Sequence, residues 1–176
     1  MHFPQEVGLR DARRVIIRPF TDRDTDALFA FFHGLPEERR RLAWDRIDSR
    51  RVVETWAREI DYEKTVPLLA WAGAKVVADA TLHYRKVGPL RRVGRIKWLI
   101  HPDYLGAGVG TALITDFIEM ARGNGLRHLT CMLVGDLDDD AATTLERMGF
   151  QTYRIPDYGT DPDGNVIDMM KMVLRL

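Results

Sequence analysis

The sequence has one cysteine, no long hydrophobic run and no excess of charge of either sign. Cys131 alone cannot form an intrachain disulfide, which favours a reducing compartment, so we expect a cytoplasmic protein. No apolar stretch approaches the roughly 20 residues that a membrane-spanning helix needs. The first fifteen residues lack the apolar segment of a secretion signal. We therefore expect no membrane partner.

Basic and acidic residues balance at 26 each, so the formal net charge is zero. Nucleic-acid-binding proteins need an excess of Lys and Arg, and we expect no nucleic-acid partner. The balance hides a gradient, because residues 61–135 carry a net charge of +4 and residues 136–176 carry −5. The acidic cluster between Asp136 and Asp140 suits a solvated helix N-terminus, or it attracts a cationic substrate.

The length of 176 residues, with 45% hydrophobic and 30% charged residues, suits a single domain over residues 1–176. Residues 1–13 are expected to form a flexible arm. Helical spacing of apolar residues predicts one helix after Thr21–Asp24 and a second over residues 50–62. Later helices are predicted after the glycine cluster at 106–110 and after Asp138. Strands are predicted at Val15–Ile17, Leu68–Trp71, Val76–Arg85, Arg95–Ile100, Leu129–Val134, Gln151–Ile155 and Val166–Leu174.

The linkers between these strands predict how they pair. Short turns make the three strands between residues 68 and 100 an antiparallel meander. The helix between residues 100 and 129 makes Leu129–Val134 parallel to Arg95–Ile100, in a right-handed βαβ unit. The sequence therefore predicts an α/β fold with a mixed, largely antiparallel sheet.

A glycine cluster, Leu105-Gly106-Ala107-Gly108-Val109-Gly110-Thr111, lies between a predicted strand and a predicted helix. Converging backbone N–H groups and the start of a helix favour an anion site that suits a pyrophosphate, although the cluster also suits a plain tight turn. A Walker A loop is excluded, because no Lys-Ser/Thr pair follows Gly110. A Rossmann loop is excluded because Thr111 stands where the third glycine would be.

The stretch Ile100–Leu113 resembles the acetyl-CoA loop of the GCN5-related N-acetyltransferases (GNAT), whose pattern is Arg/Gln-x-x-Gly-x-Gly/Ala after an apolar-His-Pro strand end. Residues Ala141–Phe150 resemble that family's later helix, which ends in Gly-Phe. The resemblance covers nearly the whole chain. It implies six or seven strands, about four helices, strands that splay around the cofactor, and transfer of an acetyl group from acetyl-CoA directly to a primary amine. No metal is expected, and a homodimer is possible in this class.

The resemblance also implies which residues bind the cofactor. The loop residues would hold the CoA pyrophosphate through their backbone. Leu99 and Ile100 would pair with the pantetheine amides and offer an N–H to the thioester oxygen. Asp138 and Leu145 occupy two further family positions. The cofactor-binding set implied is Leu99, Ile100, Leu105, Gly106, Ala107, Gly108, Val109, Gly110, Thr111, Asp138 and Leu145.

Four departures from the family pattern accompany this set. Leu105 stands in place of Arg or Gln, Asp138 in place of Asn, and Leu145 in place of the Tyr that protonates the leaving thiolate. The predicted strand before the loop carries Arg95 and Lys97 where relatives often place an acid. A catalytically degenerate acyl-CoA-binding module is therefore the alternative to an enzyme. Tyr104, Tyr153 and water are the remaining proton donors for the thiolate.

The acceptor amine must lose a proton before it attacks, so a base is needed. Pairing of the meander strands places His83 opposite Arg95 and Asp79 opposite Leu99, on a polar face. A neighbouring cation disfavours protonated histidine. We therefore hypothesise that His83 is the base and that Asp79 guides the amine; the alternative is that both decorate a solvated sheet face. Either a protein lysine or a small amine is compatible with the sequence.

Overall fold

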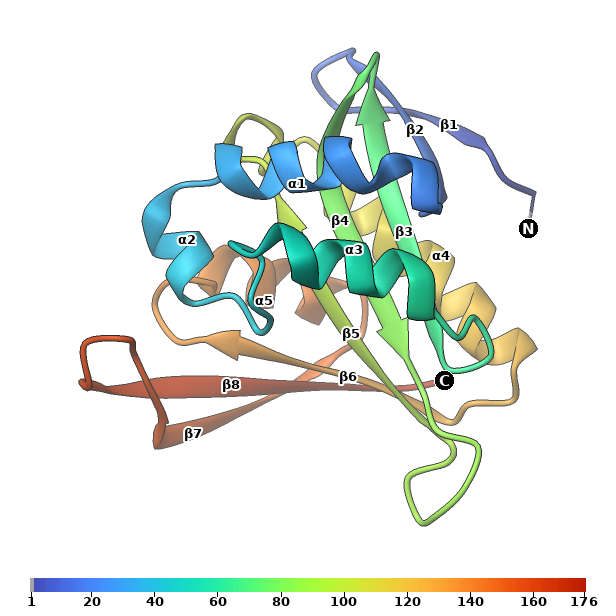
Figure 1. The fold of residues 1–176 in the computed structure, drawn as a ribbon. Helices are drawn as coiled ribbons and strands as arrows, with labels where there is room; N and C mark the ends of the chain where they lie inside the picture. The colour runs from blue at the N-terminus through green and yellow to red at the C-terminus, as the bar shows by residue number, and fades with distance from the viewer. Residues whose placement is uncertain (1) are drawn as a thin grey trace.

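The computed structural model describes residues 2–176, which form one eight-stranded sheet with helices on both faces (Figure 1). The strand order is β1-β2-β3-β4-β5-β6-β8-β7, and only β5 and β6 pair in parallel. The strands are β1 (Gln5–Gly8), β2 (Arg14–Pro19), β3 (Thr65–Ala72), β4 (Lys75–His83), β5 (Val93–Ile100), β6 (His128–Val134), β7 (Gln151–Thr160) and β8 (Val166–Arg175). The helices are α1 (Thr25–Gly34), α2 (Glu37–Arg41), α3 (Arg50–Glu59), α4 (Val109–Gly123) and α5 (Asp139–Arg147).

The predicted fold class is confirmed, with eight strands in place of six or seven and, across residues 2–176, five α helices in place of about four. One added strand replaces part of the flexible arm expected at residues 1–13, of which residue 1 lies outside the described residues. Gln5–Gly8 pairs antiparallel with β2, and Leu9 buries its side chain in the core. A four-residue strand with a single strong apolar residue, Val7, carries too little pattern to be recognised in advance.

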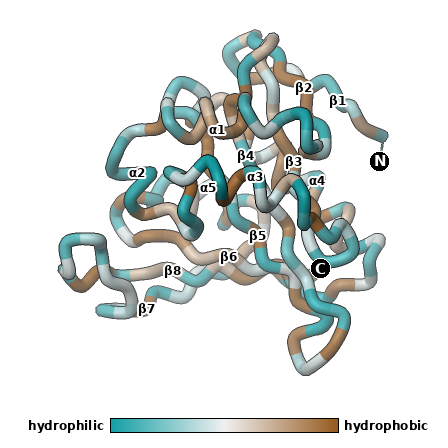
Figure 2. Tube along the Cα trace, viewed as in Figure 1, coloured by the Kyte–Doolittle hydropathy of each residue, from teal (hydrophilic) through white to brown (hydrophobic). Residues whose placement is uncertain are grey.

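The helices divide the core into two clusters on opposite faces of the sheet. Helix α4 buries Val109, Leu113 and Phe117 against one face, while α1 and α3 lie on the other (Figure 1). The cluster beneath α1 and α3 includes Phe32 and Val53. Hydrophobic residues concentrate in the central strands, and α2 and the β7–β8 turn are largely hydrophilic (Figure 2). No helix within residues 2–176 is both long enough and apolar enough to cross a bilayer.

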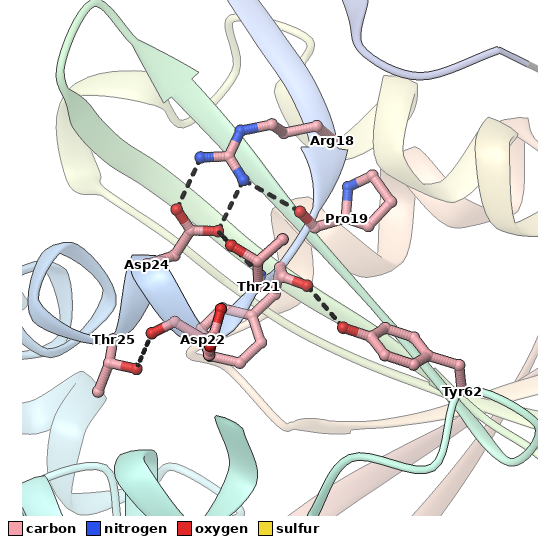
Figure 3. Close-up of polar contacts among 8 residues, drawn as sticks. Arg18, Pro19, Thr21, Asp22, Asp24, Thr25 and Tyr62 are labelled. Atoms are coloured by element: carbon pink, nitrogen blue, oxygen red, sulfur yellow. Dashed lines mark hydrogen bonds and ion pairs between the residues drawn. The ribbon is translucent and has the colours of Figure 1, made fainter. Parts of the chain in front are cut away.

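A partly buried ion pair fixes the start of α1 to β2 (Figure 3). The Arg18 guanidinium donates to both carboxylate oxygens of Asp24, at 2.6 and 2.7 Å, and it also lies 4.5 Å from the centre of the Trp71 ring. The backbone N–H and hydroxyl of Thr21 donate to the same carboxylate at 2.8 and 2.9 Å. Burial acts to raise the pKa of Asp24, but these donors leave the pKa below its usual value. This network places α1 over β4.

Candidate active site

Strands β5 and β6 begin as neighbours and then separate. Their parallel pairing covers Val93–Arg95 against His128–Thr130, and the remaining residues of both strands continue without pairing to each other. Gly94 lets the strands approach at the paired end, because a Cβ there would lie 2.8 Å from Leu129 Cδ2. Figure 1 shows β6 turning away across the view while β5 continues with β3 and β4. The expected splay is confirmed, and a cavity of about 810 Å³ opens at this point.

The strand register decides which backbone groups of β5 face the gap. The His101 N–H donates to Val77 O on the β4 side at 2.9 Å, and Leu99 lies opposite Asp79. Because backbone groups alternate along an antiparallel strand, the N–H and C=O of Leu99 also face β4, whereas those of Trp98 and Ile100 face the gap. The backbone of Leu99, expected to pair with the pantetheine amides, therefore faces β4, while the backbone of Trp98 faces the gap and the Leu99 side chain lines the cavity.

The glycine cluster forms the turn between β5 and α4, and its shape depends on two glycines with positive φ. Gly106 has φ +72° and Gly108 has φ +104°, and Gly108 is the N-cap residue immediately before α4. The first helical bond runs from the Ala112 N–H to Gly108 O at 3.0 Å, so the preceding amides have no partner within the helix. Of the predicted loop residues, Leu105, Gly106, Gly108, Gly110 and Thr111 line the cavity, while the side chains of Ala107 and Val109 are buried.

The N-terminal hairpin contacts this loop, which the sequence did not indicate. The Arg10 N–H donates to Ala107 O at 3.0 Å. Arg13 donates to Asp103 O at 2.6 Å and its guanidinium lies 3.9 Å from the centre of the Tyr104 ring. Residues 10–13 therefore form one wall beside the glycine loop.

Asp138 and Leu145 both line the cavity, but neither presents the group usual in the family. The Asp138 carboxylate accepts the Val134 N–H at 2.9 Å and forms an ion pair with Arg39 of α2. The Leu145 side chain is buried in the core and has no proton to donate. Asp138 therefore serves to join α2 to the β6–α5 turn.

Four charged or titratable side chains line the cavity beside β4 and β5, and they are Asp45, Asp79, His83 and Lys97. The register confirms that His83 lies opposite Arg95 and Asp79 opposite Leu99. Lys97 Nζ lies 2.7 Å from Asp45 Oδ2, and the His83 Nδ1 lies 3.3 Å from the Thr65 hydroxyl. Asp45, from the segment after α2, is a member that sequence reasoning missed, because it is 52 residues from its partner.

Burial shifts the two candidate bases in opposite directions. Burial, and secondarily the charge of Asp45, raises the pKa of Asp79 to about 7. Burial, with Lys97 and Arg95, lowers the pKa of His83 to about 4. Near neutral pH His83 is therefore uncharged and weakly basic, whereas Asp79 exchanges a proton in the working range. This order favours Asp79 over His83 as the proton acceptor.

The remaining candidates have clear positions. Tyr104 lines the cavity, whereas Tyr153 is 51% exposed on β7 and donates its hydroxyl proton to Gln151. Burial raises the pKa of the Cys131 thiol to about 12, which leaves it unreactive. Within residues 2–176, no group of three or more His, Cys, Asp or Glu side chains is arranged to hold a metal ion.

Comparison with known proteins shows which family and which solved structures this chain resembles. A family model described as an acetyltransferase (GNAT) domain matches residues 14–151. Among solved structures, the GNAT domain of PAT from S. lividans is 19% identical, with a TM-score of 0.77 and coverage of 98% of this chain and 96% of that one. The yncA protein of Salmonella typhimurium, described as a putative acetyltransferase with its cofactor acetyl-CoA, is 18% identical, with a TM-score of 0.76 and coverage of 92% and 94%. Ribosomal-protein-alanine N-acetyltransferase from Brucella melitensis is 22% identical, with a TM-score of 0.75 and coverage of 91% and 99%.

Proposed function

The chain belongs to the GNAT family of acyl-CoA-dependent N-acetyltransferases, and from that premise we propose that it moves the acetyl group of acetyl-CoA directly to a primary amine. The observation that carries the proposal is the gap between β5 and β6, with the glycine loop at its mouth and Asp79 on the adjacent strand. The gap suits the donor, and the carboxylate suits a cationic acceptor.

The backbone of this chain fits the donor. The amides at the start of α4 lack helical partners, and Gly106 and Gly108 expose them without a side chain. We assign to Gly106–Thr111 the binding of the CoA pyrophosphate. Trp98 and Ile100 direct amide and carbonyl groups into the gap, where they would pair with the pantetheine amides. An N–H from this edge would stabilise the oxygen on which charge develops during transfer.

Asp79 is assigned the role of proton acceptor, directly or through one water molecule. A carboxyl group with a pKa of about 7 can attract an ammonium ion and then take its proton near neutral pH. The Lys97–Asp45 pair lies beside it and adjusts that pKa, since Lys97 lowers it and Asp45 raises it. His83 stays neutral and lines the acceptor end of the cavity. This assignment gives Asp79 the role of base that the sequence suggested for His83.

The leaving thiolate takes its proton from Tyr104 or from water. Leu145 stands at the family position of the proton donor and cannot serve, and Tyr153 is exposed away from the cavity lining. Tyr104 lines the cavity next to the glycine loop. Replacement of Tyr104 by Phe distinguishes the two sources, because turnover would slow only if the Tyr104 hydroxyl is the proton donor.

The test is thiol release from acetyl-CoA in the presence of lysine peptides, N-terminal peptides and small amines. Turnover with any of these acceptors, and none without an acceptor, supports direct transfer. CoA binding without turnover on any acceptor favours the degenerate binding module, for which the buried Leu145 argues. Failure to bind CoA refutes the proposal.

A further inference from the structure

The turn between β1 and β2 holds an arginine against the glycine loop. Arg10 is tethered through its own amide, which donates to Ala107 O at 3.0 Å. The turn is closed by the Leu9 N–H donating to Arg13 O at 2.8 Å, and Arg13 fastens it to Tyr104 and to Asp103 O. The position of Arg10 is therefore set by backbone contacts on both sides.

The side chain of Arg10 crosses the start of α4. A Cβ added to Gly108 would lie 3.9 Å from Arg10 Cγ and 4.0 Å from Arg10 Nε. The side chain lines the cavity, and among residues 2–176 it has no hydrogen-bond acceptor and no acidic partner. Its neighbour Arg13, by contrast, is paired with Asp11 at 2.6 Å.

The side chain of Arg10 is exposed, and it brings a second positive charge to the start of α4. The N-terminus of a helix carries a partial positive charge, and an arginine beside it adds a second one. A phosphate group between the guanidinium and the free amides would be bound by both. Leu105, where the family pattern has Arg or Gln, has no such group to offer and is 55% exposed.

We propose that Arg10 is a cofactor-binding residue that contacts the pyrophosphate of acetyl-CoA and supplies the cation missing at Leu105. The inference rests on the proposed function, since it concerns the same donor site. It adds the N-terminal hairpin to that site as a second wall. Arg10 binds the donor and takes no part in acid–base chemistry.

The experiment is calorimetric titration of CoA into the wild-type protein, Arg10→Gln and Arg10→Lys. Loss of the charge in Arg10→Gln is expected to weaken CoA binding about tenfold, as for one charge-assisted hydrogen bond, while Arg10→Lys loses less than about threefold. The affinity of the wild-type protein should fall more steeply than that of Arg10→Gln when salt is raised to roughly 0.5 M. With dephospho-CoA, the loss in Arg10→Gln should be the same, because the pyrophosphate is retained.

The matched control is Arg14→Ala, on the same hairpin but paired with Glu6 and 76% exposed. It should bind CoA as the wild-type protein does. Wild-type affinity in Arg10→Gln, in a protein that binds CoA, overturns the role of Arg10 and leaves the proposed function standing. A loss seen with CoA but not with dephospho-CoA overturns the pyrophosphate assignment. Absence of CoA binding in the wild-type protein refutes the proposed function itself.

Discussion

The proposed donor side and the proposed acceptor side of the cavity are built from different kinds of groups. On the donor side the groups that face the cavity are mainly backbone amides, from β5 and from the glycine loop, with Arg10 beside them. On the acceptor side the polar groups are charged or titratable side chains from β4, β5 and the segment after α2. A site made of backbone depends on local geometry, whereas a site made of charges depends on which elements meet in the folded chain.

The two sides differ most clearly in the substitutions that each tolerates. Donor-side amides keep their direction whatever side chains surround them, provided that Gly106 and Gly108 keep their positive φ. The pKa of Asp79 depends instead first on burial and then on the charges of Asp45 and Lys97, which lie far from it in sequence. We therefore expect a substitution in one region to leave the other largely unchanged, and the following predictions test that separation.

The largest effect is expected from Gly108→Val. A β-branched residue at φ +104° is strained, and its side chain would enter the space in front of the α4 amides. CoA affinity should fall more than about 100-fold, corresponding to roughly 2.7 kcal/mol. Calorimetry measures the affinity, and circular dichroism checks the fold. Gly123→Ala, at an open position on α4, is the control and should bind normally.

The second effect concerns Asp79→Asn, which removes the proposed proton acceptor but keeps the shape. We expect kcat to fall about 100-fold or more while the KM for acetyl-CoA stays within about twofold. The acidic limb of the pH–rate profile, set by the pKa of about 7, should disappear. The exposed Asp48→Asn serves as the control for loss of a carboxylate. An unchanged profile in Asp79→Asn would exclude the role.

Asp79→Asn should also change stability with a definite sign. Burial raises the pKa of Asp79 in the folded state from 3.8 to about 7, so folding opposes ionisation, and the wild-type protein loses stability as pH rises through that window. The variant does not titrate there. The free energy of unfolding of the variant, minus that of the wild-type protein, should grow from about pH 4 to pH 7 and then level off. Urea unfolding at several pH values measures this, and a constant difference would contradict it.

Loosening α1 should affect the acceptor side more than the donor side. Asp24→Ala removes the carboxylate that binds Arg18 and Thr21, and we expect a cost of about 2 kcal/mol in free energy of unfolding. Acceptor KM should rise, with CoA affinity nearly unchanged. Asp26→Ala, whose exposed carboxylate pairs with Arg50, should cost less than about 0.5 kcal/mol. Equal losses on the two sides would argue against the separation.

The smallest effect is expected from Arg39→Ala. Arg39 joins α2 to Asp138 and to Leu137 O, so its loss should let the segment with Asp45 move. Acceptor KM is expected to rise about threefold to tenfold, about 1 kcal/mol, without a change in CoA affinity. Arg51→Ala on the exposed side of α3 is the control. A weaker affinity for CoA in Arg39→Ala would instead place Asp138 in the donor site.

The same division explains what the sequence could predict. The glycine loop and the pairing of His83 with Arg95 follow from local patterns and short turns, the splay was implied by the family resemblance, and the structure agrees. Arg10 was missed because β1 has too little pattern to show that it packs on the loop. To see that the backbone of Trp98, and not that of Leu99, faces the gap requires the hydrogen-bond register, which the amino-acid sequence does not give.

The order of the two candidate bases could not be predicted for a related reason. A neighbouring cation does lower the pKa of His83, as the sequence suggested, but burial is the larger cause and lowers it too far for an effective base. The raised pKa of Asp79 depends on burial beneath α1 and α3 and on Asp45. Both are consequences of tertiary packing.

The parting of β5 and β6 also has a mechanical consequence. Five strands lie on one side of the gap and three on the other, and the two sets share only three residue pairs of backbone contact. At the open end they are tied by ion pairs from α2, Arg39 to Asp138 and Arg41 to Asp163. The first junction is made of backbone hydrogen bonds, and the second is made of ion pairs, which salt weakens. Raised ionic strength is therefore expected to weaken the junction at the open end more than the hydrogen-bonded junction.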